Sequence, residues 1–286
     1  MVLLGNIHRP TEQIGHNFNS KIMEEKIRIP TIQELAAKGE TPELLFWVGC
    51  AGSFDQRAQR ITRDICKILN HVKIRYAILG TEESCTGDPA KRAGNEFIFQ
   101  IQAISNIQIL DKYKISKIVT ACPHCFNTIK NEYPNLGGNY QVIHHSQLIQ
   151  SLIDEGKLIP SDHKVFKGKK IAYHDPCYLG RGNDIYEAPR KVLESLDADL
   201  VELKRCKKNG LCCGAGGAQM FKEPESGVKD INIERIEDVK ESKADIVASA
   251  CPFCMTMLRD GVKTKEMEKS IEVLDIAELT VISNNL

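Results

Sequence analysis

Nine of the eleven cysteines in this chain of 286 residues fall into two sets with matching spacing. The first cysteine set is Cys50, Cys85, Cys122 and Cys125. The second cysteine set is Cys177, Cys212, Cys213, Cys251 and Cys254. Up to the C-P-x-C motif that ends each set, the steps are 35 and 37 residues in the first set and, counted through Cys213, 36 and 38 in the second. This agreement predicts two copies of one cysteine-bearing unit.

Three kinds of chemistry suit cysteines in such numbers. A C-x-x-C pair alone is typical of thiol–disulfide oxidoreductases, but that chemistry leaves the other cysteines without a role. Structural zinc takes four ligands, as many as the first set offers, whereas the second set has five. Because Cys212 and Cys213 are adjacent and point in divergent directions, they suit two irons of one iron–sulfur cluster better than one tetrahedral ion. The glycines of "GAGG" that follow would let backbone N–H groups donate to sulfur.

The cysteines are expected to follow strands. Short apolar runs rich in β-branched and aromatic residues lie at 43–49, 74–80, 117–121 and 140–144, and again at 169–174, 198–204, 244–250 and 271–275. Helical patterns such as 55–72 and 95–113 separate them. The alternation predicts an α/β fold of two tandem repeats, each a small, mainly parallel sheet flanked by helices. The cysteines then lie at the carboxyl ends of strands, where ligand sites of open sheets gather.

A proline follows the first cysteine of each C-P-x-C motif, and proline suits the first position of a helix. Cys122 and Cys251 are therefore expected to cap helices, with Cys125 and Cys254 on the first turn. The positive end of a helix favours thiolate, the form that binds metal.

Composition limits the partners and the compartment. The 38 basic and 38 acidic residues cancel, so no excess charge indicates nucleic acid or an anionic membrane. No apolar run approaches the length of a membrane span, and the start of the chain lacks the pattern of a signal peptide. We therefore expect a cytoplasmic protein without a membrane span of its own, in which cysteines bind metal rather than form disulfides.

Three segments are expected. Residues 1–40 match neither repeat and form an N-terminal arm, either a disordered tail or a segment that docks a partner. Within the arm, "TIQELAAKG" is expected to be one short helix. Residues 41–160 form the first cysteine-bearing domain, and residues 161–286 form the second.

The second half carries a resemblance to a known family. Cys177, then "CCG" at 212–214, then "CPFC" at 251–254 resembles the cysteine-rich CCG domain. That domain occurs in tandem in the B subunit of heterodisulfide reductase and in iron–sulfur subunits such as that of glycolate oxidation. The segments "YHDPCYLGR" and "VIHHSQLIQSLIDEGKL" also look like family segments, and the resemblance covers about residues 44 to 283. It implies a noncubane [4Fe–4S] cluster held by the five cysteines of the second set.

The first half departs from the family pattern. It has "SCTG" where "CCG" is expected, so we align Ser84 with the first cysteine and regard Thr86 as inserted before Gly87. Four thiolates remain, which could hold an ordinary [4Fe–4S] cluster, a noncubane cluster with a serine or an open position, zinc, or nothing.

Further polar residues are candidates for a place around the centres. His174, His144 and His145 could donate hydrogen bonds to a cluster or move protons, or could be ordinary satisfied polar groups at strand ends. Arg181 could bind an anionic substrate, offset cluster charge, or lie on a surface loop. Trp47 is expected to be core.

Two cysteines have no counterpart in the other half. We expect Cys66 to be a buried, small apolar residue on a helix. Cys206 lies six residues before Cys212, and its role stays open.

The resemblance implies an electron-transfer subunit of an oxidoreductase. Two alternatives stay open: a catalytic thiol or disulfide reductase subunit acting at the noncubane cluster, and a zinc-stabilised interaction protein without redox chemistry. The expected partner is a flavoprotein, a ferredoxin-type dicluster iron–sulfur subunit, or both, which could be membrane-bound. The chain lacks the C-x-x-C-x-x-C runs of dicluster ferredoxins, so we expect a separate partner polypeptide.

Overall fold

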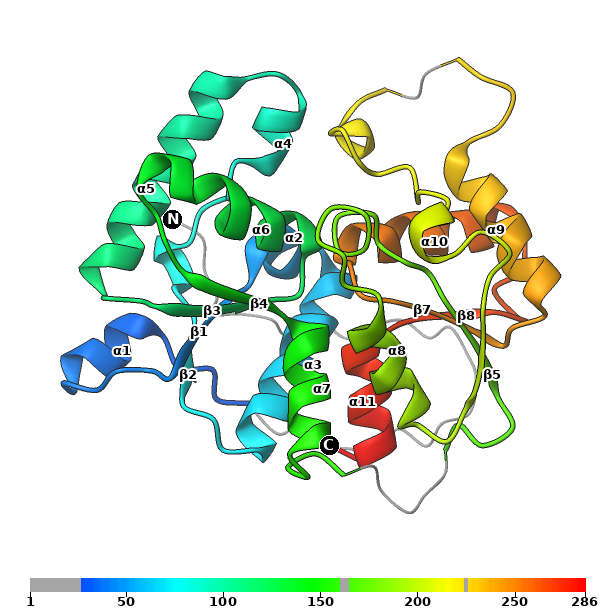
Figure 1. Cartoon of the computed structure of the whole chain (residues 1–286), viewed down its shortest axis with the longest axis horizontal. Coiled ribbons are helices and arrows are strands. Elements are labelled where there is room, and N and C mark those ends of the chain that lie inside the picture. The colour runs from blue at the N-terminus through cyan, green and yellow to red at the C-terminus, as the bar shows by residue number, and fades with distance from the viewer. Residues whose placement is uncertain (1–26, 160–164, 224–225) are drawn as a thin grey trace.

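Two parallel four-stranded sheets form the framework of the protein (Figure 1). The computed structural model describes residues 27–159, 165–223 and 226–286. The first sheet has the order β2-β1-β3-β4 and consists of β1 (Leu44–Trp47), β2 (Tyr76–Ala77), β3 (Lys117–Thr120) and β4 (Gln141–His144). The second has the order β6-β5-β7-β8 and consists of β5 (Lys170–Tyr173), β6 (Asp199–Val201), β7 (Ile246–Ser249) and β8 (Glu272–Asp275). The predicted pair of small parallel sheets is confirmed.

Helices connect the strands in the same order in each half. In the first half they are α2 (Gly49–Phe54), α3 (Gln56–His71), α4 (Asp88–Arg92), α5 (Glu96–Lys112), α6 (Pro123–Asn127) and α7 (His145–Asp154). In the second half they are α8 (Glu187–Glu194), α9 (Ile231–Ser242), α10 (Pro252–Thr264) and α11 (Ile276–Asn284). No helix among the described residues is both long and apolar enough to cross a membrane.

Local chemistry sets where these helices begin. The Asp55 carboxylate caps α3 by accepting a hydrogen bond from the Ala58 amide at 2.7 Å, which satisfies one of the free amides of the first turn. Cys122 and Cys251 precede the prolines that start α6 and α10, as predicted. α7 and α11 both start with capping boxes, in which Gln147 and Glu278 bond back to the cap residue.

Two helices of each half pack on two helices of the other. α3 packs on α11, and α7 packs on α8, so that these four helices lie between the two sheets (Figure 1). Because α3 is the counterpart of α8 and α7 that of α11, the two contacts repeat each other. Buried polar groups join the halves within this layer: Arg57 pairs with Glu278, and His145 Nε2 lies 3.0 Å from an oxygen of Asp275. The expected boundary at residues 160 and 161 lies outside the described residues.

The described part of residues 1–40 is attached to the first sheet. α1 (Ile32–Ala37) is the predicted short helix, with a capping box between Thr31 and Glu34. The chain before it pairs with the edge beyond β2, because the Ile32 amide donates to the Ile78 carbonyl at 2.8 Å and the Ile78 amide donates to the Pro30 carbonyl at 3.0 Å. The expected arm before residue 27 lies outside the described residues.

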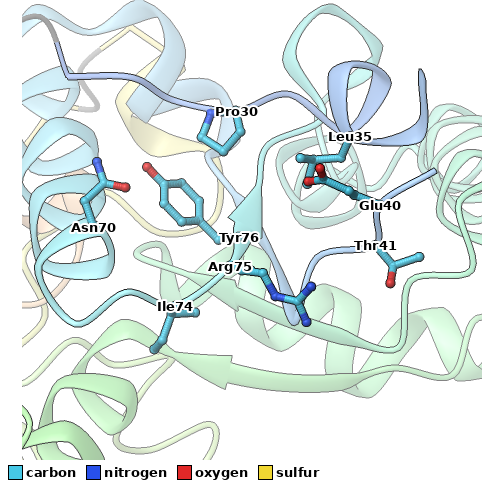
Figure 2. Close-up of a pocket in the computed structure, with 8 residues that line it drawn as sticks. All are labelled: Pro30, Leu35, Glu40, Thr41, Asn70, Ile74, Arg75 and Tyr76. Atoms are coloured by element: carbon cyan, nitrogen blue, oxygen red, sulfur yellow. The ribbon is translucent and has the colours of Figure 1, made fainter. Parts of the chain in front are cut away.

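A small pocket lies beside this attachment. It measures about 140 Å³ and borders the amino end of β2, away from the strand ends that carry cysteines (Figure 2). Its lining is Pro30, Leu35, Glu40, Thr41, Asn70, Ile74, Arg75 and Tyr76. The pocket is therefore separate from the cysteine sets.

The Arg57–Glu278 pair should contribute measurably to stability. Substituting Arg57→Ala leaves the buried Glu278 carboxylate without its cationic partner, although the bond from the Asp275 amide remains. We expect a loss of about 3 kcal/mol in the free energy of unfolding. Urea unfolding would measure this loss. The exposed pair between Arg75 and Glu43 is the matched control, because Arg75→Ala should cost less than about 1 kcal/mol. Equal losses in both variants would contradict a special role for the pair between the halves.

Candidate metal centres

The first cysteine set comes together from three strand ends. Cys50 lies in α2 after β1, Cys85 follows β2, and the C-P-x-C motif follows β3. The thiols of Cys50 and Cys85 hydrogen-bond to each other, as do those of Cys122 and Cys125. Gly49 has a φ of +77°, and a Cβ there would lie 3.3 Å from Cys125 Sγ, so this position favours glycine for both its backbone angle and its lack of a side chain. Four thiols distant in sequence therefore share one site.

The second cysteine set forms a continuous chain of thiols. Cys212 hydrogen-bonds with both Cys177 and Cys213. Cys254 in turn hydrogen-bonds with Cys213 and with Cys251. Besides contacting each other, Cys212 therefore reaches Cys177, whereas Cys213 reaches Cys254.

Because the thiols of each set lie close together, the pKa of one thiol is lowered and the pKa values of others are raised. In the second set, hydrogen bonds from Cys177 and then Cys213 hold the pKa of Cys212 far below its usual range. The Gly214 amide, 3.3 Å from Cys212 Sγ, lowers that pKa further. In the first set, the bond from Cys50 lowers the pKa of Cys85 to about 7.

The remaining thiols shift the other way. Hydrogen bonding and burial raise the pKa of Cys50, Cys177 and Cys254. These thiols therefore carry their protons at neutral pH. A bound metal must displace several protons from each set.

The alignment of "SCTG" with "CCG" differs from our expectation. Cys85 is the counterpart of Cys212, because each sulfur accepts a hydrogen bond from the amide two residues later. Those amides belong to Gly87 and Gly214, whose φ angles are 90° and 95°. Cys85 therefore does not correspond to Cys213.

Thr86 takes the place of Cys213. Both side chains are buried, and the Thr86 hydroxyl donates to Cys125 Sγ at 3.8 Å, just as Cys213 bonds with Cys254. The spacing in the sequence also indicates this alignment, because Cys50 to Cys85 and Cys177 to Cys212 are both steps of 35 residues. Thr86 is thus a replacement for the second cysteine, and the expectation that it is an insertion is wrong.

Ser84 has a different role from the one expected. Its hydroxyl donates to Asn106 Oδ1 at 2.8 Å, and the amide of Asn106 donates to the carbonyl of Cys85 at 2.9 Å. Ser84 therefore orders the loop through α5 and is not the counterpart of a cysteine. Sequence reasoning did not identify Asn106, which is fully buried.

Side chains tie the cysteine loops to one another. In the first half the Glu83 carboxylate accepts hydrogen bonds from the amides of Val48 and Gly49 at 3.1 and 2.6 Å, and burial raises its pKa to about 7. In the second half Arg181 donates to the Gly210 carbonyl at 2.9 Å. Arg181 thus links the loop of Cys177 to the loop of Cys212. The sequence analysis did not identify Glu83.

His174 lies beside the second set. A ring nitrogen of His174 and the sulfurs of Cys213 and Cys254 all lie within 4.8 Å of one another. Arg235 Nε donates to His174 Nδ1 at 3.0 Å. Burial, followed by the charge of Arg235, lowers the pKa of His174 to about 3, so the ring is neutral at pH 7. Arg235, fully buried on α9, gave no signal in the sequence.

His144 and His145 lie behind the cysteine loops. His144 Nε2 lies 3.2 Å from the carbonyl of Ala121, and the backbone of Ala250 also hydrogen-bonds with the ring. Since these alanines precede Cys122 and Cys251, His144 contacts both C-P-x-C loops. His145 pairs with Asp275.

His124, within the C-P-x-C motif of the first set, contacts two rings beside cysteines of the second set. Its ring stacks on Tyr178 with centroids 4.1 Å apart and meets the edge of Phe253 at 5.4 Å. Its Nδ1 lies 2.9 Å from Asp88. Tyr178 follows Cys177, and Phe253 lies within "CPFC", so a cluster of contacting rings joins the two sets. Sequence reasoning did not identify it.

The unpaired cysteines and Trp47 have other surroundings. Cys66 is buried on α3, as predicted, and burial raises its pKa to about 12. Cys206 is half-buried, and the charged groups that act on it include Glu202 and Asp175 rather than the second set. Trp47 is fully buried in the core, as predicted.

The chain belongs to the cysteine-rich CCG domain family, whose model matches residues 44–130 and again 171–259. One match falls on each half and contains that half's cysteine set, while β4 and β8 lie beyond the matched residues. The repeated match confirms the tandem arrangement.

Several curated proteins are similar over most of this chain. The probable iron-sulfur-binding oxidoreductase FadF of Bacillus subtilis is 43% identical over 88% of this chain and 35% of its own length. The EtfAB:quinone oxidoreductase of Syntrophomonas wolfei is 41% identical over 86% of this chain and 35% of its own. The D subunit of the dihydromethanophenazine:CoB–CoM heterodisulfide reductase of Methanosarcina barkeri is 33% identical over 93% and 65%. The chain therefore spans about a third of the first two relatives.

The placement of Thr86 can be tested with a new thiol. In the metal-free protein, mild oxidation of a Thr86→Cys variant should link the new thiol to Cys125, because the present hydroxyl lies 3.8 Å from that sulfur. Peptide mapping would detect the link. A matched Ser84→Cys variant should form no such bond, since its side chain faces Asn106. A bond to Cys125 from position 84 alone would instead support the alignment of Ser84 with a cysteine.

Proposed function

We propose that this chain is an iron–sulfur electron-transfer subunit of an oxidoreductase, with a noncubane [4Fe–4S] cluster in its second half. The observation that carries the proposal is the continuous chain of five thiols, in which Cys212 contacts Cys177 and Cys213 contacts Cys254. A single tetrahedral zinc ion takes only four ligands. Five thiolates that reach different neighbours suit several irons.

The first half is proposed to hold a second and different centre. Its ligands would be Cys50, Cys85, Cys122 and Cys125. Because the Thr86 hydroxyl stands where the second half has a thiol, the set offers four thiolates, which suit an ordinary [4Fe–4S] cluster or zinc. The two centres would therefore differ in ligand number.

The surroundings of both sets fit such clusters. When bound, a cluster of this kind accepts and releases one electron at a time. The chain contributes the amides of Gly87 and Gly214, which donate to ligand sulfur at 3.5 and 3.3 Å. The His124 ring of the first half contacts the rings of Tyr178 and Phe253 beside cysteines of the second set. This arrangement supports electron transfer from one centre to the other.

The partners we propose follow from the relatives. One relative is named for EtfAB, another is a probable membrane-anchored ferredoxin of Chromohalobacter salexigens, and this chain spans 35% and 36% of their lengths. We infer a partner that carries flavin, ferredoxin-type clusters, or both, and that can hold this chain at a membrane from the cytoplasmic side.

A catalytic role is the second candidate. The relative from Methanosarcina barkeri is named as part of a heterodisulfide reductase. In that case the second centre would act on a disulfide substrate. New paramagnetic states on adding thiols to the oxidised protein would favour this role, and their absence would favour electron transfer alone.

Metal analysis tests the proposal and separates the two centres. Anaerobically reconstituted protein should contain iron and acid-labile sulfide, and Cys212→Ala should remove the iron of the second centre. Cys85→Ala should remove either iron or zinc from the first centre and leave the second intact. Cys66→Ala is the matched control, because that thiol is buried within α3 and its loss should change no metal content. Zinc without iron in the unmodified protein would overturn the proposal and leave an interaction protein.

A further inference from the structure

A buried donor faces the second cysteine set. His174 is fully buried, and its Nε2 has no hydrogen-bond partner among the described residues. A buried ring nitrogen without a partner is costly and indicates a group that the structure does not contain. The nearby sulfurs of Cys213 and Cys254, within 4.8 Å of a ring nitrogen, show where that group would lie.

Arg235 fixes the tautomer of His174. Its Nε donates to His174 Nδ1 at 3.0 Å. A guanidinium group has only donors, so Nδ1 must accept with its lone pair, and the ring proton must lie on Nε2. His174 therefore carries an N–H group at Nε2, the ring nitrogen that has no partner among the described residues.

We propose that His174 is a positioning residue that donates a hydrogen bond from Nε2 to a sulfur of the second centre and is not one of its ligands. A metal–Nε2 bond would need the lone pair that the proton occupies. Removing that proton would leave an imidazolate while Arg235 still donates to the other nitrogen. The inference deepens the proposed function and rests on the presence of an iron–sulfur cluster.

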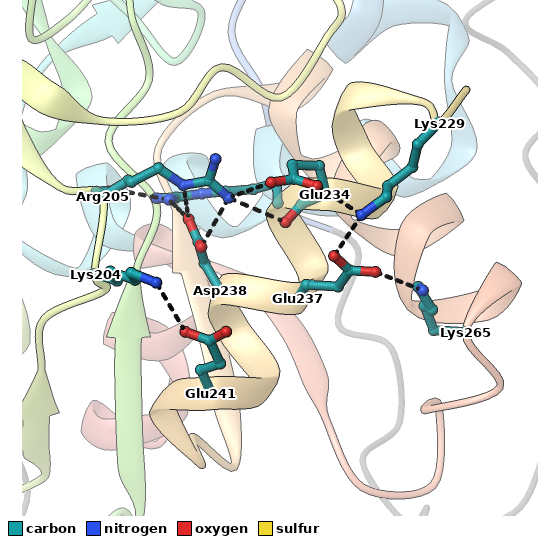
Figure 3. A network of polar contacts seen from close by, with 9 residues as sticks. Lys204, Arg205, Lys229, Glu234, Glu237, Asp238, Glu241 and Lys265 are labelled. Carbon is teal, nitrogen blue, oxygen red and sulfur yellow. Dashed lines mark hydrogen bonds and ion pairs between the residues drawn. The ribbon is translucent and has the colours of Figure 1, made fainter. Parts of the chain in front are cut away.

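Arg235 is held by Asp238 and by the Arg205 backbone. These two residues belong to an ion-pair network in which Arg205 also pairs with Glu234 (Figure 3). Arg235 Nη1 donates to the Arg205 carbonyl at 2.7 Å and to Asp238 Oδ2 at 3.1 Å. Asp238 also accepts two bonds from the Arg205 guanidinium at 2.8 Å. Glu234 binds Arg205 and Lys229, while Glu237 binds Lys229 and, beyond α10, Lys265. α9 is thereby fixed against the helix that begins after Cys251.

The donor should raise the reduction potential of the second centre. Reduction adds negative charge to the cluster, and an N–H bond to sulfur stabilises that charge. Substituting His174→Leu should therefore lower the ratio of reduced to oxidised centre at a fixed potential by about tenfold, which corresponds to about 59 mV for one electron. His174→Gln keeps an N–H donor and should restore part of the ratio.

Trp47 provides the matched control. It lies three residues before Cys50, as His174 lies before Cys177, and its buried indole N–H also has no partner among the described residues. Trp47→Phe should leave the potential of the second centre unchanged. Redox titrations followed by EPR, with iron and sulfide counted in each variant, would make the comparison.

Magnetic resonance on the unsubstituted protein gives a direct test that does not depend on a variant folding. With ¹⁵N-labelled histidine and exchange into D₂O, pulsed EPR should show an exchangeable proton and a weak nitrogen coupling at the second centre. A strong nitrogen coupling would overturn the inference by making His174 a ligand. An unchanged potential in His174→Leu with full iron content would also overturn it while leaving the proposed function intact. Absence of iron would overturn both.

Discussion

The electrostatic cost of placing several thiolates in one site is the constraint on which this structure depends. Each cysteine set gathers four or five thiols, yet in each set one pKa is held low while others are raised. Several thiolates together need a positive centre. The scaffold brings the thiols together from three strand ends, and the glycines at 87 and 214 hold their loops at positive φ so that amides face sulfur. The fold thus supplies the geometry and leaves the charge to be supplied by metal.

Packing between helices of the two halves brings the two sets close to each other. α3 packs on α11 and α7 on α8, and α2 contacts α10, which begins after Cys251. His144 contacts the backbone before both C-P-x-C motifs. The His124 ring then contacts Tyr178 and Phe253, which come from two different cysteine loops of the second half. The two sets therefore share part of their surroundings.

The sequence predicted the scaffold better than the surroundings of the thiols. Apolar runs and C-P motifs indicate strands and helix starts because these are set by local preferences, and the two sheets and both helix starts were confirmed. The register of "SCTG" was wrong because two alignments differ by one residue, and only contacts such as the Thr86–Cys125 bond choose between them. Glu83, Asn106 and Arg235 act on residues 21 to 61 positions away, so no local pattern marks them.

Two differences between the halves lie close to the cysteines in the sequence. The capping boxes of α7 and α11, the prolines that start α6 and α10, and the paired glycine amides are retained in both copies. By contrast, Thr86 occupies the position equivalent to Cys213, and Trp47 occupies the position equivalent to His174. One difference changes the number of thiolates, and the other changes the donor beside them. Ligand number and hydrogen bonds to sulfur both set the reduction potential of a cluster. Two copies of one fold would therefore hold centres of different potential, and electrons would pass from the centre of lower potential to the centre of higher potential.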